Sequence, residues 1–394
     1  MTNSDDTSGA GLTRQTKVLH LGRDPDGQNG FVNTPVYRGS TVLFPTLERL
    51  KSRKQPFTYG RRATPTTLAL EAAITELEGG SATILTSSGL GAVSTALLAF
   101  VEAGDHILMV DSVYQPTRAF CDNMLARLGV ETTYYDPLIG ERITGLIKSN
   151  TRLVFVESPG SQTFEMQDIP AIAKIAQAKN LWVLADNTWS SPLLCNPLRL
   201  GADVSIQAAT KYIVGHADAM LGSVTANARA AKYIDNAKEA LGTCPGSEET
   251  YLGLRGLRTL DVRLQRHMTS GMAMAKWLEA RPEVARVIHP ALPSHPGHDL
   301  WRRDFSGASG LFAAVLKPVP EKALAAFLDH LQLFAMGYSW GGYESLVIPF
   351  DPSSYRTATK WTDKGPALRF HIGLDAVEDL QADLAAGFER MRGA

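Results

Sequence analysis

Apolar residues recur along the chain in two patterns, helical repeats and short continuous runs. Between residues 66 and 77 they fall at helical spacing and stop at Gly79-Gly80, which predicts a helix and its end. Apolar runs typical of strands buried on both faces follow at 82–85, 106–110, 153–157, 181–185 and 204–207, with a further candidate at 220–225. Helical stretches, including 92–100 and 169–178, separate most of them. This alternation predicts an α/β fold with a mainly parallel sheet and helices on both faces.

The pattern changes at both ends of the chain. Residues 1 to about 60 carry Gly, Asp, Asn and Pro with little periodicity, which indicates an irregular arm that must lie on something else to be ordered. After residue 249, a long helix at 258–279 precedes short strands at 287–289, 311–316 and 368–372 and helices at 322–331 and 377–391. We therefore predict three parts: an N-terminal arm (1–61), a larger sheet domain (62–256) and a smaller C-terminal α/β domain (257–394).

Composition narrows the range of partners. The chain has 394 residues, 44% of them hydrophobic, and a net charge of −1, so no electrostatic field favours nucleic acid or an anionic membrane. We expect no membrane span, and the acidic N-terminus lacks a signal-peptide core. Cys121, Cys195 and Cys244 lie far apart, which predicts small buried thiols in a reducing, cytoplasmic setting and neither a disulfide framework nor a metal site.

Four polar features follow the predicted strands, at the edge of an open α/β sheet where ligands bind. Lys211 comes shortly after the 204–207 run and is well placed to form an imine with an aldehyde. Asp186 directly follows the 181–185 run, where a protonated pyridine nitrogen would suit a poorly solvated carboxylate. Tyr114 follows the 106–110 run and could stack on a flat ring. The small residues at 86–92 open a helix and could cradle a phosphate.

Each feature alone has a simpler interpretation, namely a surface lysine, a turn-capping aspartate, a tyrosine at a domain edge and a tight turn. As a dinucleotide fingerprint, the segment 89–94 lacks the third glycine, and the first strand of the usual dinucleotide-binding unit is missing from the N-terminus. Together the features fit one ligand, because a pyridine that carries an aldehyde and a phosphate uses all four. The sequence therefore predicts pyridoxal 5'-phosphate (PLP) as the cofactor.

Longer stretches of the chain resemble the Cys/Met-metabolism family of PLP enzymes, which has fold type I. The resemblance covers nearly the whole length, is weakest in residues 1–25, and lies in the stretches 59–62, 77–80, 157–161, 186–189, 208–212 with 215–216, 338–345 and 368–373. It implies a seven-stranded, mainly parallel sheet. It also implies a carbon–sulfur β-lyase of methionine biosynthesis that converts L-cystathionine to homocysteine, pyruvate and ammonia.

The resemblance assigns the phosphate contacts of the cofactor. Gly89 and Leu90 would offer backbone N–H groups, and Thr210 would add a hydroxyl. Tyr59 and Arg61 would reach the phosphate in a neighbouring subunit, which implies at least a dimer and, by family habit, a homotetramer.

The resemblance also implies a substrate site. Arg369 would clamp the α-carboxylate with its two-pronged guanidinium, and Ser339 and Trp340, with Tyr114, would line the pocket. Many family members carry a serine where this chain has Ala208, which has no hydroxyl to offer the phosphate. His216 is expected to be structural.

In the expected reaction, a phenolate at Tyr114 or Tyr59 would take a proton from the substrate amine. Lys211 would remove the α-proton, while Asp186 keeps the pyridine nitrogen protonated. Lys211 or Tyr114 would then protonate the leaving sulfur. The alternatives are a γ-acting relative (a γ-lyase or a γ-synthase), a broad cysteine-S-conjugate β-lyase, a PLP-binding regulator with little catalysis, and a nicotinamide dehydrogenase.

Overall fold

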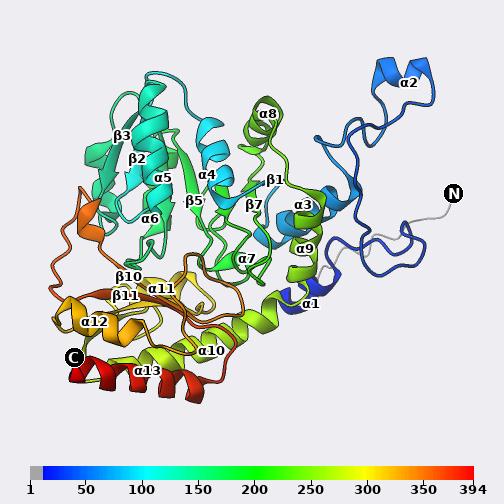
Figure 1. The fold of residues 1–394 in the computed structure, drawn as a ribbon. Helices are drawn as coiled ribbons and strands as arrows, with labels where there is room; N and C mark the ends of the chain where they lie inside the picture. The colour runs from blue at the N-terminus through cyan, green and yellow to red at the C-terminus, as the bar shows by residue number, and fades with distance from the viewer. Residues whose placement is uncertain (1–11) are drawn as a thin grey trace.

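A computed structural model describes residues 12–394 and shows two β-sheets with helices packed around them (Figure 1). The larger sheet has seven strands in the order β1-β7-β6-β5-β4-β2-β3. In chain order, the strands are β1 (Ala82–Thr86), β2 (His106–Val110), β3 (Glu131–Tyr135), β4 (Thr151–Glu157), β5 (Trp182–Asp186), β6 (Val204–Gln207) and β7 (Gly222–Ala226). β7 runs opposite to the other six strands, which share one direction, so the predicted mainly parallel sheet is confirmed.

The sequence pattern missed the edge strand β3. Its residues are Glu-Thr-Thr-Tyr-Tyr, and only the last of them is fully buried. An edge strand has one free side and need not be apolar throughout, so the signal of a continuous apolar run is absent here.

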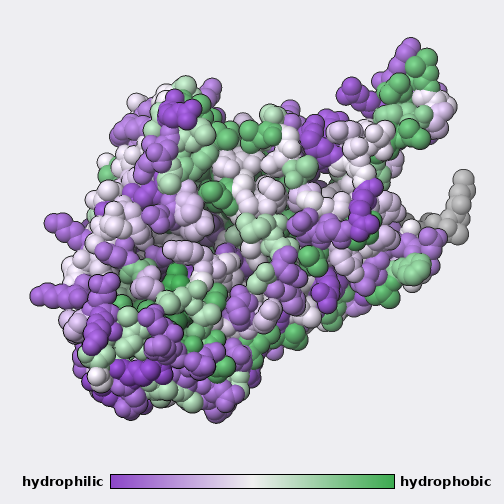
Figure 2. Space-filling view, in the orientation of Figure 1, coloured by the Kyte–Doolittle hydropathy of each residue, from purple (hydrophilic) through white to green (hydrophobic). Residues whose placement is uncertain are grey.

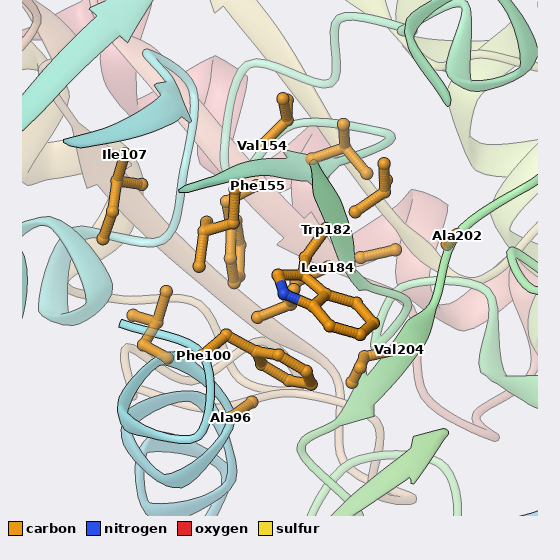
Figure 3. Packing of buried hydrophobic residues seen from close by; sticks show 14 of the residues in the cluster. Ala96, Phe100, Ile107, Val154, Phe155, Trp182, Leu184, Ala202 and Val204 are labelled. Carbon is orange, nitrogen blue, oxygen red and sulfur yellow. The ribbon is translucent and has the colours of Figure 1, made fainter. Parts of the chain in front are cut away.

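Helices cover both faces of the large sheet. On one face lie α4 (Gly89–Leu98), α6 (Ile169–Ala178) and α8 (Ala231–Leu241), and on the other lie α3 (Pro65–Glu78) and α9 (Ser247–Leu257). Consecutive residues of β1 therefore belong to different cores: Ile84 packs with the first group and Leu85 with the second. In the first core, Phe100 packs against Trp182 of β5 at a centroid distance of 4.8 Å (Figure 3).

The second sheet is antiparallel and lies beyond the carboxyl ends of the parallel strands (Figure 1). It has the order β10-β11-β9-β8, from β8 (Val284–Ile288), β9 (Leu311–Leu316), β10 (Leu346–Phe350) and β11 (Ala367–His371). Three helices share its core: α10 (Leu260–Glu279), α12 (Glu321–Leu328) and α13 (Val377–Gly393). The predicted helix at 258–279 corresponds to α10, and β10 was missed. The domain boundaries at 61/62 and 256/257 stay a prediction.

The expectation of an irregular arm is only partly correct. Two short helices, α1 (Arg14–His20) and α2 (Leu47–Ser52), lie within it, and residues 1–11 lie outside the described part. The segment around α2 projects from the body and carries apolar side chains on its surface (Figures 1 and 2). Leu43 is 84% exposed and Phe31 is 70% exposed. Such exposure is costly in water, which agrees with an arm that rests on another surface.

The remaining short elements connect these layers. They are α5 (Gln115–Ala119), the π-helical turn η1 (Phe120–Leu125), η2 (Gly140–Leu146), α7 (Ser191–Leu194), α11 (His298–Asp304) and η3 (Pro352–Ser354). Cys121 and Cys195 are buried as predicted, but Cys244 is exposed, so that prediction is wrong for Cys244. Residues 12–394 contain no disulfide and no cluster that could hold a metal ion, and none of their helices combines the length and apolarity of a membrane span.

Phe155 of β4 tests the packing of the first core, because its side chain is fully buried there. Phe155→Ala should lower the free energy of unfolding by about 3–5 kcal/mol through lost burial and the cavity left behind. The urea midpoint of the purified protein measures this loss. Leu138→Ala, at a side chain that is 55% exposed, should change the free energy of unfolding by no more than about 0.5 kcal/mol. Equal losses in the two variants would contradict the assigned core.

Candidate active site

The predicted site residues of the large sheet gather at the carboxyl ends of its central strands, facing the second sheet. Asp186 is the last residue of β5 and lies opposite Glu157, the last residue of β4. Tyr114 follows β2 by four residues, and Lys211 follows β6 by the same number. Parallel strands place their carboxyl ends on one edge, which is why residues far apart in the chain meet here.

The sequence suggested that Lys211 stands at the end of a strand. In the structure it lies in a turn that follows β6. The turn is closed by hydrogen bonds from Lys211 N–H to Ala208 C=O (2.9 Å) and from Gly215 N–H to Lys211 C=O (2.7 Å). Its Nζ donates to Ser339 Oγ at 2.6 Å and lies 5.4 Å from the centre of the Trp340 ring. The amine therefore has one polar partner and an aromatic wall.

Burial makes the Lys211 amine easier to deprotonate. Loss of solvent and the nearby positive charge of Arg369 lower the pKa of Lys211 to about 8, while Asp186 and Glu344 oppose the shift. A neutral amine is the nucleophilic form and the proton-accepting form of lysine. The site thus supplies a reactive amine close to neutral pH.

Asp186 presents one carboxylate oxygen to the site. Its Oδ1 accepts hydrogen bonds from the N–H (3.0 Å) and the hydroxyl (2.6 Å) of Thr188, whereas Oδ2 has no partner in residues 12–394. Burial raises the pKa of Asp186 above its ordinary value, against the opposing effect of Thr188 and Lys211. A carboxylate with a free oxygen and a raised pKa is suited to a cationic ring nitrogen.

Sequence reasoning missed Thr188. Its hydroxyl accepts the N–H of Ala208 at 2.9 Å while donating to Asp186, so it ties the end of β5 to the segment that leads to Lys211. The Asp-x-Thr spacing after an apolar strand was the available signal, since a Thr two residues on can hydrogen-bond back to the carboxylate.

Tyr114 caps the site from the side of β2. Its N–H donates to Glu157 Oε2 at 2.8 Å, and its ring is 43% exposed toward the opening. Burial and the carboxylates of Asp186 and Glu157 raise the pKa of the Tyr114 phenol, and Arg369 opposes this. The free side chain is therefore a phenol, and the base role that we expected for its phenolate needs an added positive charge nearby. Glu157, which positions Tyr114, was also missed; it stands directly at a strand end, as Asp186 does.

The predicted phosphate cradle has free donors. Helix α4 starts at Gly89, and Ser88 caps it by accepting the Gly91 N–H at 3.0 Å. The N–H groups of Gly89 and Leu90 have no acceptor in the described chain. A Cβ added at Gly89 would lie 2.4 Å from the Cβ of Ala208, so only glycine allows this close approach. Two free amides at a helix N-terminus fit an anion.

Thr210 is less available than expected. Its hydroxyl donates to Leu221 C=O at 3.0 Å and accepts from Leu221 N–H at 2.8 Å. A hydroxyl has one hydrogen, so donation to a phosphate would require it to leave Leu221.

The substrate-side residues come from the second sheet and the segment before β10. Arg369 of β11 donates from Nη2 to Ser339 C=O at 3.0 Å, while its Nε is buried without a partner in the described residues. Burial lowers the pKa of Arg369 to about 10. Ser339 has φ +78°, a strained backbone for serine that lets it contact Lys211 with its hydroxyl and Arg369 with its carbonyl.

The backbone after Trp340 is held against Lys211. Gly341 has φ +88°, and a Cβ there would lie 3.0 Å from the Lys211 Cα. Its N–H donates to Nε2 of the buried His371 at 3.0 Å. His371 was missed, although its two-residue spacing from Arg369 in a strand places both on one face.

Tyr59 and Arg61 lie in the arm and not beside Lys211. They line a cavity of about 280 Å³ with Arg62, Glu71 and Lys238 among others, whereas a larger cavity of about 550 Å³ around Arg14 contains none of the predicted site residues. Arg61 Nη1 is buried without a partner in the described part of the chain, and Nη2 is 3.8 Å from Glu239. One chain alone does not join this pair to the other site residues, so their role stays a prediction.

Comparison with known proteins agrees with this geometry. Four relatives named cystathionine β-lyase are 41–46% identical to this chain over 95% of its length. One from Salmonella typhimurium is 46% identical over 387 residues, 95% of this chain and 98% of its own. An L-alanine/L-glutamate racemase from Wolbachia pipientis is 37% identical and covers 96% of this chain and 98% of its own.

Solved structures show the same architecture. The crystal structure of a cystathionine gamma synthase from Xanthomonas oryzae, in complex with aminoacrylate and cysteine, superposes with a TM-score of 0.89 at 31% identity, covering 97% of this chain and 99% of its own. The family model described as Cys/Met metabolism PLP-dependent enzyme matches residues 15–389. The predicted resemblance, fold and cofactor are confirmed, and the chain belongs to the Cys/Met metabolism family of PLP-dependent enzymes.

Proposed function

We propose that this chain is a carbon–sulfur β-lyase that converts L-cystathionine to homocysteine, pyruvate and ammonia. The single observation that carries the proposal is the Lys211 amine, held at 2.6 Å by Ser339, with a pKa of about 8 and with Asp186 and Arg369 close enough to affect it. The family fixes the cofactor as PLP. The relatives named cystathionine β-lyase support this choice of substrate and bond.

When bound, PLP supplies an electron sink for the electrons released at the substrate α-carbon. The residues that would hold it are those with free donors or acceptors. The amides of Gly89 and Leu90 would bind the phosphate, and Oδ2 of Asp186 would face the ring nitrogen. Tyr114 would stack on the ring.

Each reacting group of the substrate has a partner in the site that carries the opposite charge or the protonation state that the step requires. The guanidinium of Arg369 would take the α-carboxylate, using the Nε that has no protein partner. The neutral amine of Lys211 would remove the α-proton, and Lys211 or the Tyr114 phenol would then protonate the leaving sulfur at Cβ. Because its pKa is raised, the Tyr114 phenol keeps its proton and can donate it. For Tyr114 to act as a base, the positive charge of the substrate must lie close to it.

We also infer that the active unit is an oligomer with shared sites, most simply a homotetramer of the family type. The exposed apolar arm and the unpartnered Arg61 Nη1 support a contact in which Tyr59 and Arg61 reach the phosphate of a neighbouring subunit. The three free cysteines support a reducing, cytoplasmic setting.

Related activities share the first half of this chemistry. γ-Elimination would give 2-oxobutyrate instead of pyruvate, racemisation would give the D-amino acid and no keto acid, and a PLP-binding regulator would give no product. By resemblance, the large Trp340 against Lys211 favours β-elimination, because γ-acting relatives have a smaller residue there. Incubation with L-cystathionine and identification of the keto acid tests the proposal, and pyruvate is expected.

Lys211→Ala should lower pyruvate release from L-cystathionine by about 10³-fold or more, because it removes the proton-transferring amine. Steady-state assays with lactate dehydrogenase coupling measure the loss. The control is Lys179→Ala at the exposed end of α6, which should retain the wild-type rate. Wild-type turnover by Lys211→Ala would refute the assigned role.

Capture of PLP by the cofactor-free protein should depend on pH with a midpoint of about 8, because the pKa of Lys211 is lowered to that value by burial and only the neutral amine reacts. An ordinary lysine would give a midpoint of about 10.4. Borohydride fixation across pH 6–11, followed by mass spectrometry of the Lys211 peptide, measures the midpoint, with Lys211→Arg as the control. Labelling elsewhere, or a midpoint near the ordinary lysine value, would contradict the site.

Arg369→Lys keeps the positive charge but loses the fork that binds a carboxylate through two parallel hydrogen bonds. We expect KM for L-cystathionine to rise about 10–100-fold with a smaller change in kcat. Arg303→Lys, at an exposed arginine paired with Asp168 and Asp304, is the matched control and should leave KM unchanged. A selective fall in kcat with constant KM would argue against carboxylate binding by Arg369.

A further inference from the structure

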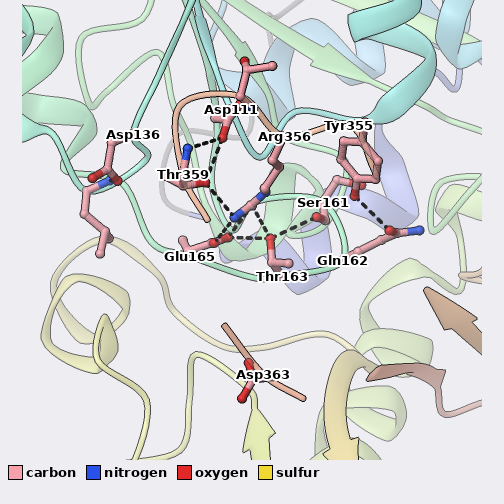
Figure 4. Close-up of polar contacts among 12 residues, drawn as sticks. Asp111, Asp136, Ser161, Gln162, Thr163, Glu165, Tyr355, Arg356, Thr359 and Asp363 are labelled. Atoms are coloured by element: carbon pink, nitrogen blue, oxygen red, sulfur yellow. Dashed lines mark hydrogen bonds and ion pairs between the residues drawn. The ribbon is translucent and has the colours of Figure 1, made fainter. Parts of the chain in front are cut away.

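One connection of the C-terminal part reaches across to the large sheet. The connection between β10 and β11 runs past the ends of β2 and β4 before it returns to the second sheet (Figures 1 and 4). We call residues 351–363 of this connection the strap. Two groups of buried polar contacts hold it there, and neither has a part in the chemistry described above.

The first group centres on the Asp111 carboxylate, which is completely buried just after β2. From the strap, it accepts the N–H of Thr357 (3.0 Å) and both the N–H (2.9 Å) and the hydroxyl (2.7 Å) of Thr359. From the large sheet side, it accepts Nη2 of Arg118 at 2.5 Å. Burial acts to raise the pKa of Asp111, but the strap's hydrogen bonds and Arg118 more than offset it, so the group is a carboxylate.

The second group centres on Arg356 of the strap, whose side chain is 3% exposed. Its Nη1 pairs with Glu165 Oε1 at 2.6 Å, and its Nη2 donates to Thr163 Oγ1 at 2.5 Å and to Glu165 Oε2 at 3.1 Å (Figure 4). Nearby, the Tyr355 hydroxyl donates to Gln162 Oε1 at 3.1 Å. These partners all lie in the loop that follows β4, directly after Glu157.

Both groups of contacts hold segments that adjoin site residues in the chain. Asp111 and its partner Arg118 flank Tyr114 in the sequence, and Arg118 lies in α5, the helix that begins after Tyr114. The loop bound by Arg356 starts after Glu157, whose carboxylate accepts the Tyr114 N–H. At its other end, the strap leads into β11, which carries Arg369. The strap is thus the backbone segment that links Arg369 to the contacts around Tyr114.

We propose that Asp111 and Arg356 are positioning residues that set the gap between Tyr114, on the large sheet, and Arg369, on the second sheet. This inference rests on the proposed function, because the gap is the space that the amino acid end of the substrate occupies. Arg369 would bind the carboxylate of the substrate, and Tyr114 would face the amino group of the substrate. Both contacts therefore form together only at one distance between the two residues.

The contacts are suited to this task because they are buried and charged. A surface ion pair breaks and reforms at little cost, whereas separation of a buried pair leaves an uncompensated charge in a poorly solvated place. The planar guanidinium of Arg356 also fixes direction as well as distance, since it binds Glu165 through two nitrogen–oxygen contacts.

The strap also supplies its own control. Asp363 pairs with Arg286 of β8 at 2.5 Å, so this contact lies within the C-terminal part and leaves the large sheet untouched. Asp363→Asn therefore loosens the strap at a point that does not bear on the gap.

The test compares holoenzymes of the wild type, Arg356→Gln with Glu165→Gln, and Asp363→Asn. The double variant removes both charges of the pair and keeps a polar side chain at each position. We expect it to raise KM for L-cystathionine about tenfold while kcat falls less, and Asp363→Asn to match the wild type. Hydrogen exchange of the cofactor-free proteins is the second measurement, and amides at 112–120 should exchange faster in the double variant alone.

Equal kinetics and equal exchange in all three proteins would overturn the proposal, as would a KM effect without faster exchange at 112–120. If the double variant does not fold, Thr359→Val decides, since it removes one hydroxyl on Asp111 and leaves every charge in place. It should show the same two changes at about threefold, and wild-type behaviour would overturn the proposal. Failure of the wild type to release pyruvate would instead refute the proposed function, while the exchange result would still report on the strap.

Discussion

The structure of the site depends on the burial of one amine. Lys211 Nζ has a single hydrogen-bond partner, Ser339, and stands in a partly buried position beside the Trp340 ring. An ammonium group is poorly solvated in such a place, and its pKa falls to about 8. Burial therefore favours the neutral amine, which is the form that reacts with an aldehyde and takes a proton from carbon.

Other parts of the fold keep that amine in position. The turn after β6 sets its direction, and Thr188 ties the turn to the Asp186 carboxylate. On the opposite side, Gly341 lets the backbone approach Lys211, and His371 holds that backbone. Thr188, Gly341 and His371 are neutral, so they fix geometry without adding charge to a site whose pKa values are set by a few neighbours.

The site combines two sheets of different type. The parallel sheet brings Asp186, Tyr114 and the start of α4 to one edge, and the antiparallel sheet presents Arg369 across from them. In the proposed reaction, the cofactor binds to the first sheet and the substrate carboxylate to the second. Catalysis would then depend on how the two sheets are placed relative to each other, and the buried contacts of the strap would fix that placement.

The apolar runs and helical repeats determined most of the elements, because strands buried on both faces and amphipathic helices leave strong local patterns. They also placed Lys211, Asp186 and Tyr114 after strands, which is enough to group them at one edge of a parallel sheet. The partly polar edge strand β3 and the exposed Cys244 left no such signal, and Pro349 interrupts the apolar run of the missed strand β10. Thr188, Glu157, His371 and the ties from Asp111 and Arg356 were decided only by the tertiary structure, since each depends on a partner from another strand or loop. Hydrogen bonds between segments far apart in the chain have no period in the sequence, and they exist only once packing has brought donor and acceptor together.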